Sequence, residues 1–175
     1  MIGAPQAKSK AGSQHRGIRR RHASRLAAVQ ALYQIEVTGD QAIGVIEEYS
    51  QHRIDGQDVE VADGAKANKT FFVELVQGVT GNLAQIDERL NLLITSRRTV
   101  DELEVVLRSI LRTASYELGH RYQVPARSVI KEYVRIADAF FFGKEPSFVN
   151  GLLDKIARSL RPGELEDREN PNGSD

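Results

Sequence analysis

Cysteine is absent from this 175-residue sequence, and so is any long apolar run. Without cysteine the chain can form neither disulfides nor thiolate metal sites, a pattern typical of proteins in a reducing compartment. No apolar stretch approaches the roughly 20 residues that span a bilayer, and no secretory signal is evident. We therefore expect a cytoplasmic protein without a membrane segment.

The motifs of common catalytic and metal sites are also missing. Gly143 and Lys144 lack the other residues of a phosphate-binding loop, and the serines do not lie in a nucleophile elbow. The carboxylates are scattered over polar positions, where nothing would tune them for acid or base catalysis. The histidines have no spacing typical of a helical metal site: His15, His22, His52 and His120. We predict a protein that is not an enzyme and has no metal or cofactor.

Charge is balanced in total but divided along the chain, with 24 basic and 24 acidic residues. The last residues are mainly acidic. The N-terminal residues before the first carboxylate, Glu36, carry only basic charges: Lys8, Lys10, Arg16, Arg19, Arg20, Arg21 and Arg25. A net charge of zero therefore does not argue against a polyanionic partner.

The apolar spacing predicts an all-α fold, because no segment shows convincing strand alternation. Residues 1–17 and 162–175 have too little to bury, and we expect a flexible basic tail and a flexible acidic tail around a helical domain at 18–161. The first helix is predicted from about Arg20 to Thr38, stopped by Gly39. Its inward positions would be Leu26, Val29, Leu32 and Tyr33.

Further helices follow from the same spacing. Asp40 can cap a short helix carrying Ile43, Ile46 and Tyr49, and residues 55–64 read as a loop. One long helix is predicted from about Phe72 to Leu93, with Gly78 and Gly81 inside it to allow close helix contact.

The second half of the chain has clearer start and stop signals. Thr99 and Glu102 form a capping box before a helix that reaches Leu118. Pro125 begins the next helix, which ends at Gly143, and the last helix runs from about Phe148 to Pro162. Within that last helix, Asn150 and Gly151 are expected to serve packing and a buried hydrogen bond.

The arginines at the start of the first predicted helix suggest an anion-binding site. If Arg19, Arg20 and Arg21 occupy the helix N-terminus, the macrodipole disfavours their charge, and a bound phosphate would compensate. Arg25 lies one turn after Arg21, so both could follow a sugar-phosphate backbone, with His22 and Gln30 near the bases. The alternative is a solvated basic face.

Aromatic side chains add to this interpretation, because single-stranded RNA is commonly held by base stacking. Phe140, Phe141 and Phe142 are consecutive, and on a helix they cannot all point into the core, so at least one should be exposed. Tyr33 can be read either as an RNA contact or as a core tyrosine.

Two blocks of sequence resemble the NusB family of bacterial transcription antitermination factors. The first reads RHASRLAAVQALY over residues 21–33. The second consists of Ile110-Leu111-Arg112, Tyr116-Glu117-Leu118, Val124-Pro125, Ile130-Lys131-Glu132 and Phe148-Val149-Asn150-Gly151-Leu152-Leu153-Asp154-Lys155. The resemblance covers about residues 19–161.

The resemblance implies about seven helices in two perpendicular three-helix bundles. It also implies binding of boxA RNA together with the small-subunit ribosomal protein NusE, in an RNA polymerase complex with other Nus factors on ribosomal RNA operons. The free protein would be a monomer or a weak homodimer. RNA contacts carried over by the resemblance, together with the basic residues beside them, are Arg19, Arg20, Arg21, His22, Arg25, Gln30, Tyr33, Phe140, Lys144 and Phe148.

Two alternatives remain open. The chain could be a helical protein-interaction adaptor whose arginines only solubilise it. It could also be an RNA-binding domain related to the N-terminal part of ribosomal RNA cytosine methyltransferases. Because the residues after 161 are few and polar, we expect a free-standing factor instead.

Overall fold

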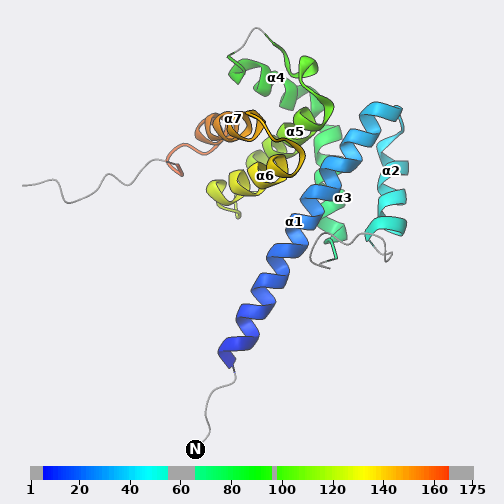
Figure 1. Ribbon diagram of the computed structural model, residues 1–175, viewed down its shortest axis with the longest axis vertical. Helices are drawn as coiled ribbons and strands as arrows, with labels where there is room; N and C mark the ends of the chain where they lie inside the picture. Colours follow the sequence, from blue (N-terminus) through cyan, green and yellow to red (C-terminus); the bar gives the residue numbers. More distant parts are fainter. Residues whose placement is uncertain (1–5, 55–65, 96–97, 166–175) are drawn as a thin grey trace, which may run out of the picture. The chain divides into compact units, whose positions relative to one another are not determined.

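A computed structural model describes residues 6–54, 66–95 and 98–165, and these ranges contain α-helices and no strand (Figure 1). The α-helices are α1 (Gln6–Thr38), α2 (Ala42–Glu48), α3 (Lys69–Gly81), α4 (Leu83–Leu93), α5 (Val105–His120), α6 (Ala126–Phe140) and α7 (Glu145–Leu160). A π-helical turn spans Tyr49–Ile54, and a 3-10 turn spans Val100–Glu102. The predicted all-α fold is confirmed. Within the described ranges, no helix is both long and apolar enough to cross a membrane.

The chain divides into two compact units, Met1–Leu83 and Ala84–Asp175. In the first unit α1, α2 and α3 pack on one another. Small side chains of α1, among them Ala27, Ala28 and Ala31, are buried and let the helices approach closely. Tyr49 stacks on Phe72 with ring centroids 5.7 Å apart. Alanine is thus the most frequent buried residue in the described part of α1, and larger apolar side chains complete the core of this unit.

Helix α1 is longer than predicted, because it begins at Gln6 and not near Arg20. Residues 6–17 contain seven good helix formers beside two glycines, two serines and a histidine, so propensity alone does not account for this extension. Extending a helix that packing has already nucleated needs no new nucleus, so these turns can form although their sequence carries no apolar stripe. The predicted stop is confirmed: Gly39 follows the helix with a φ of 75°. Its N–H donates to the Ile35 carbonyl at 2.9 Å.

Helix α2 departs from the prediction at its start. Gln41 is the N-cap residue, whereas the Asp40 carboxylate accepts a hydrogen bond from the Thr38 hydroxyl at 2.7 Å. Ile46 and Tyr49 are buried as expected, but Ile43 is exposed. The predicted loop at 55–64 lies outside the described residues.

The long helix predicted from Phe72 to Leu93 is two helices, broken at Asn82. The Asn82 amide donates to the Gly78 carbonyl at 2.8 Å, and its backbone N–H bonds to Val79 instead of continuing the α-helical ladder. A Cβ on Gly81 would meet nothing within 4 Å, so the prediction of close helix contact is wrong for this glycine. The break interrupts the α-helical hydrogen bonding for one residue only. The apolar residues on either side therefore keep a helical spacing, and the sequence pattern does not reveal the break.

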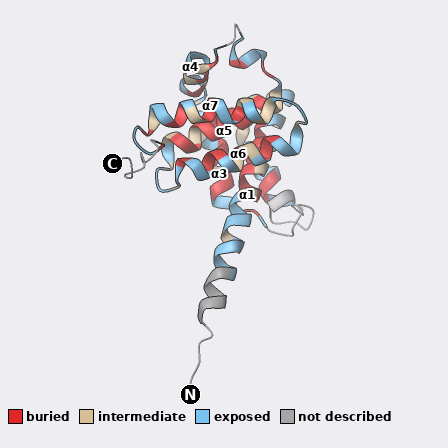
Figure 2. Cartoon of the chain, turned by 60° about the vertical axis from the view of Figure 1, so that its left-hand side comes forward, coloured by how far each residue is buried: buried red, intermediate tan, exposed pale blue. Residues whose placement is uncertain are grey.

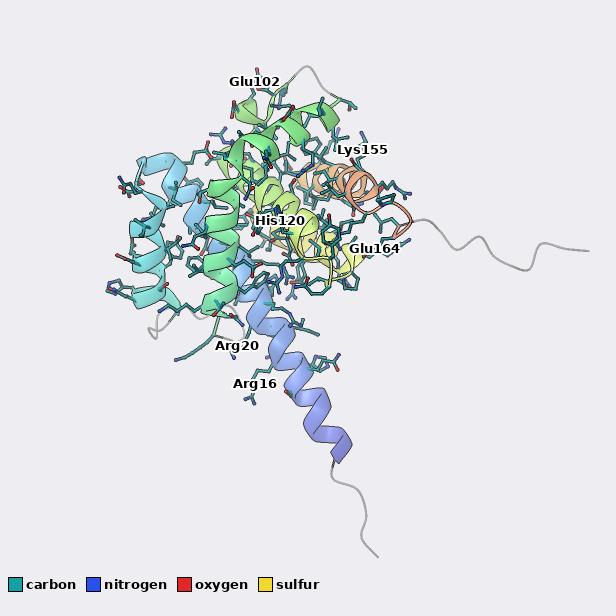
Figure 3. The ribbon with its side chains drawn as sticks, turned by 180° about the vertical axis from the view of Figure 1, so that it is seen from behind. Arg16, Arg20, Glu102, His120, Lys155 and Glu164 are labelled. Atoms are coloured by element: carbon teal, nitrogen blue, oxygen red, sulfur yellow. The ribbon has the colours of Figure 1, made fainter. Side chains whose placement is uncertain are left out.

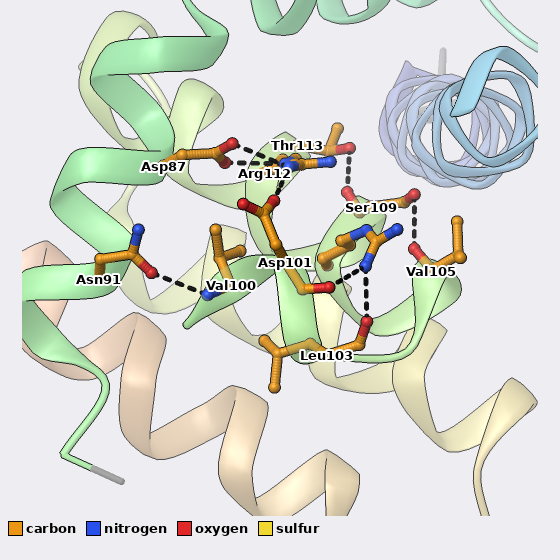
Figure 4. Close-up of polar contacts among 10 residues, drawn as sticks. Asp87, Asn91, Val100, Asp101, Leu103, Val105, Ser109, Arg112 and Thr113 are labelled. Atoms are coloured by element: carbon orange, nitrogen blue, oxygen red, sulfur yellow. Dashed lines mark hydrogen bonds and ion pairs between the residues drawn. The ribbon is translucent and has the colours of Figure 1, made fainter. Parts of the chain in front are cut away.

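In the second unit, polar contacts fix the start of α5 (Figure 4). Glu102 accepts from the Thr99 backbone N–H at 2.7 Å, which confirms the capping box, although it caps the 3-10 turn and α5 begins at Val105. Arg112 is buried and pairs with both oxygens of Asp87 at 2.8 Å. This bidentate ion pair joins α5 to α4.

Helices α5, α6 and α7 pack on one another and contain most of the buried side chains of the second unit. Pro125 precedes α6 directly, as predicted, although the helix ends at Phe140, before Gly143. Asn150 and Gly151 are exposed, and a Cβ on Gly151 would meet nothing, so the packing role expected for them is wrong. Leu165 is buried, so packing extends into the predicted C-terminal tail, whose residues 166–175 lie outside the described residues.

Candidate nucleic-acid interface

Exposed arginines occupy the N-terminal half of α1. Arg16, Arg19, Arg20 and Arg21 are all exposed, and most of α1 between residues 12 and 21 is exposed to solvent (Figure 2). Arg16 and Arg20 project from the same side of the helix (Figure 3). Because no acidic residue precedes Glu36, these positive charges are not offset along the helix.

The position of these arginines shows that the predicted effect of the helix macrodipole on them is wrong. Since α1 begins at Gln6, Arg19, Arg20 and Arg21 lie several turns inside the helix and not at its electropositive end. The effect of the macrodipole is confined to the first and last turns, so it does not act on these residues. What supports anion binding is therefore the density and exposure of the cations.

Arg25 differs from the other arginines, because only 3% of its surface is exposed. Its guanidinium carbon lies over the ring of Phe71, 5.2 Å from the ring centroid. Arg21 and Arg25 therefore do not project along one exposed edge, as the sequence had suggested. An RNA contact by Arg25 would require its guanidinium to leave the Phe71 ring, and we assign this residue a structural role in the first unit.

The other candidates of the first unit lie along α1 with different exposure. His22 and Gln30 are half-buried, and Tyr33 is 41% exposed. Tyr33 is thus not a core tyrosine, which was the alternative left open by the sequence. These three side chains present polar and aromatic groups on the helix that carries the exposed arginines.

The second unit contributes candidates from the turn between α6 and α7. Phe140 is 37% exposed, Phe142 is fully exposed and Lys144 is exposed, while Phe148 is half-buried in the first turns of α7. The prediction that one of the three consecutive phenylalanines is exposed is confirmed by Phe142. A cation beside accessible rings is an arrangement that suits a nucleic-acid strand, which offers phosphates and base faces together.

The structure gathers the predicted residues into two sets, one on α1 and one at the α6–α7 turn. It also exposes two further residues, Arg16 and Phe142, that the sequence patterns do not single out as contacts. Arg16 was assigned to the tail because the helix start was misplaced. Phe142 belonged to the phenylalanine triplet, but the helical pattern alone did not say which of the three rings would be exposed.

A sequence model described as the NusB family matches residues 22–158. Two curated relatives are both described as transcription antitermination protein NusB. The protein from Caulobacter vibrioides is 46% identical, covering 82% of this chain and 96% of the relative. The protein from Maricaulis maris is 43% identical, covering 84% and 91%.

Solved structures agree with this match. NusB from T. maritima superposes with a TM-score of 0.69 at 28% identity, covering 82% of this chain and 94% of that one. A crystal structure of antitermination factors NusB and NusE in complex with dsRNA has a TM-score of 0.62 at 23% identity, covering 81% and 98%. At that identity the second likeness concerns the fold alone.

Proposed function

Because this chain belongs to the NusB family, we propose that it acts as a transcription antitermination factor that binds boxA RNA together with NusE. It would join RNA polymerase and other Nus factors in the cytoplasm, chiefly on ribosomal RNA operons, and would catalyse no reaction. NusE is the partner to test first, because a protein of the same fold was crystallised with NusE and dsRNA.

The observation that carries the RNA part of this proposal is the group of exposed arginines on α1, with no carboxylate among them. Guanidinium groups form paired, charge-assisted hydrogen bonds with phosphate oxygens, and such contacts supply most of the salt-dependent affinity for nucleic acid. Exposed rings at the α6–α7 turn would add base stacking, which is favourable for any base.

The proposed contacts divide by chemistry. Phosphates of the RNA strand that contains boxA would be bound by Arg19, Arg20 and Arg21 in the first unit and by Lys144 in the second. Polar and aromatic side chains would contact bases and sugars: His22, Gln30, Tyr33, Phe140 and Phe148. The second unit would supply most of the contact with NusE, and the free protein would be a monomer or a weak homodimer.

Two other functions would give different results in the same experiments. A protein-interaction adaptor would bind unrelated RNA and boxA RNA with the same affinity, because only nonspecific charge would attract either. A methyltransferase-related domain is disfavoured by the relatives, which are antitermination proteins covered over 91–96% of their length.

Binding of labelled boxA RNA tests the proposal directly. We expect boxA to bind more tightly than a scrambled sequence, and NusE to strengthen the binding of boxA only. If about four phosphates are neutralised, the logarithm of the affinity should fall with the logarithm of salt with a slope near −3. The affinity is measured by anisotropy at several salt concentrations, with and without NusE. Equal binding of scrambled RNA in both conditions would refute the proposal.

Substitutions of Arg21 and Arg25 distinguish a loss of RNA affinity from a loss of folding stability. Arg21→Met should leave the free energy of unfolding within about 0.5 kcal/mol, because the side chain is exposed, while making the salt slope shallower by about 0.7. Arg25→Met should lower the free energy of unfolding by about 1 to 2 kcal/mol through loss of the Phe71 contact, and leave the slope unchanged. Denaturant unfolding and RNA titration measure the two effects. A shallower slope in folded Arg25→Met would return Arg25 to the RNA contacts.

A further inference from the structure

Three arginines of α1 lie on one helical face before the residues that match the NusB family. The matched segment begins at residue 22, whereas α1 is continuous from Gln6. Arg16, Arg19 and Arg20 have the spacing i, i+3 and i+4, which places side chains on one side of a helix. We name these three residues the upstream arginine face. Arg21, one position further, points about 100° away from Arg20 and does not belong to it.

Within the residues that the structure describes, no structural role of the upstream arginine face is evident. All three side chains are exposed, and none makes a hydrogen bond or ion pair with another residue in the ranges that the structure describes. Like charges one turn apart repel each other in a helix. The face also has no carboxylate at neighbouring positions, so no local ion pair offsets this repulsion. A bound anion would remove it.

The geometry fits an extended polyanion. Arg16 and Arg20 are four residues apart, which corresponds to about 6 Å along the helix axis. Cations in a row along a straight helix can follow successive phosphates of one strand, whereas a single small anion would use only one or two of them. The face therefore suits a nucleic-acid backbone better than an isolated phosphate or carboxylate.

We propose that the upstream arginine face binds the sugar-phosphate backbone of RNA that flanks the boxA element, and so lengthens the RNA footprint. This inference rests on the proposed function, because it concerns the same RNA strand. It adds a sequence-independent contact outside boxA, and it predicts that affinity depends on RNA length as well as on the boxA sequence.

The test compares boxA RNA alone with boxA RNA lengthened by oligouridine on its 5′ or its 3′ side. For the unmodified protein, one of the two flanks should steepen the salt slope by about two units, as expected for three phosphates on a single strand. The affinity gained from that flank should then fall roughly 16-fold between about 50 and 200 mM salt. For each protein variant, the gain from the flank is the affinity for lengthened RNA divided by the affinity for boxA RNA alone. A change in boxA binding itself affects both affinities and therefore cancels.

Two triple variants separate charge from helix structure. In R16Q/R19Q/R20Q the gain from the flank should disappear, although glutamine is as good a helix former as arginine and circular dichroism should be unchanged. In R16K/R19K/R20K the positive charge remains. The flank should therefore still increase the affinity, and this increase should still fall as the salt concentration rises.

The possible outcomes are distinct. If neither flank tightens binding of the unmodified protein, or if the glutamine variant keeps the full gain with intact helicity, the upstream arginine face does not bind flanking RNA, and the proposed boxA function stands. If the unmodified protein binds lengthened RNA without preferring boxA over a scrambled sequence, the proposed function fails while the upstream contact remains.

Discussion

Replacing Arg161 with methionine is expected to lower the free energy of unfolding of the second unit by about 3 kcal/mol. Arg161 is buried, and its guanidinium donates to the carbonyls of Leu118 at 2.8 Å, Val124 at 2.6 Å and Arg121 at 3.0 Å. These acceptors include carbonyls at the C-terminal end of α5, which have no partner within the helix. Methionine fills similar space but donates no hydrogen bond, so the Leu118 and Val124 carbonyls lose this donor, while the Arg121 carbonyl keeps the Val124 N–H. Urea denaturation monitored by circular dichroism measures the loss.

Arg158→Met is the matched control, since Arg158 is exposed on α7 one turn before Arg161 and pairs with Asp154 at 2.7 Å. An exposed pair of this spacing contributes about 0.3 to 0.5 kcal/mol, so this variant should be nearly as stable as the unmodified protein. If both variants lost the same small amount of unfolding free energy, the carbonyl contacts of Arg161 would not stabilise the second unit.

The sequence was sufficient to place α5, α6 and α7 in the second unit, because several signals there agree. The capping box at Thr99, the proline before α6 and the apolar spacing of α5 and α7 all favour the same helices, and the structure confirms them. Arg161 shows what such signals leave out. An arginine after the last helix reads as a polar residue near a tail, and only the fold brings it to carbonyls about 40 positions earlier.

Helix α1 was harder to predict, for two physical reasons. The first is that sequence periodicity reports burial, and residues 6–17 form helix by propagation from a packed segment, without an apolar stripe of their own. The second is that the pattern of charges does not distinguish an arginine that faces solvent from one that covers a ring. Arg21 and Arg25 look equivalent in sequence, but in the fold Arg25 is buried against the Phe71 ring whereas Arg21 is exposed.

These corrections change the physical basis of the proposed RNA contact. A site at a helix N-terminus would rest on the dipole and on free backbone amides, and would be compact. A row of arginines inside a helix offers side-chain charge only, spread along the axis. Binding should therefore depend more steeply on salt and on RNA length than a dipole-based site would, because each guanidinium contact displaces counterions from the strand.

Phe142→Ala is expected to weaken binding of boxA RNA by about 1 to 3 kcal/mol, or roughly 5- to 150-fold, if one base stacks on this ring. The ring of Phe142 is fully exposed between α6 and α7, two positions before the exposed Lys144. A fully exposed phenylalanine gains nothing from packing within the chain, so its removal should change the free energy of unfolding by less than about 0.5 kcal/mol. The affinity is measured by anisotropy at fixed salt, and its salt slope should stay the same because no charge is lost.

Replacing Phe142 with a larger ring or with an aliphatic side chain distinguishes base stacking from simple apolar contact. Phe142→Trp should bind at least as tightly as the unmodified protein, whereas Phe142→Leu should lose most of the affinity that Phe142→Ala loses, since only a ring presents a flat face to a base. Leu92→Ala removes another exposed apolar side chain of the second unit, 79% exposed on α4, and should not affect RNA binding. Equal affinity for the leucine and tryptophan variants would contradict base stacking, because the ring would then contribute only apolar surface to the interface.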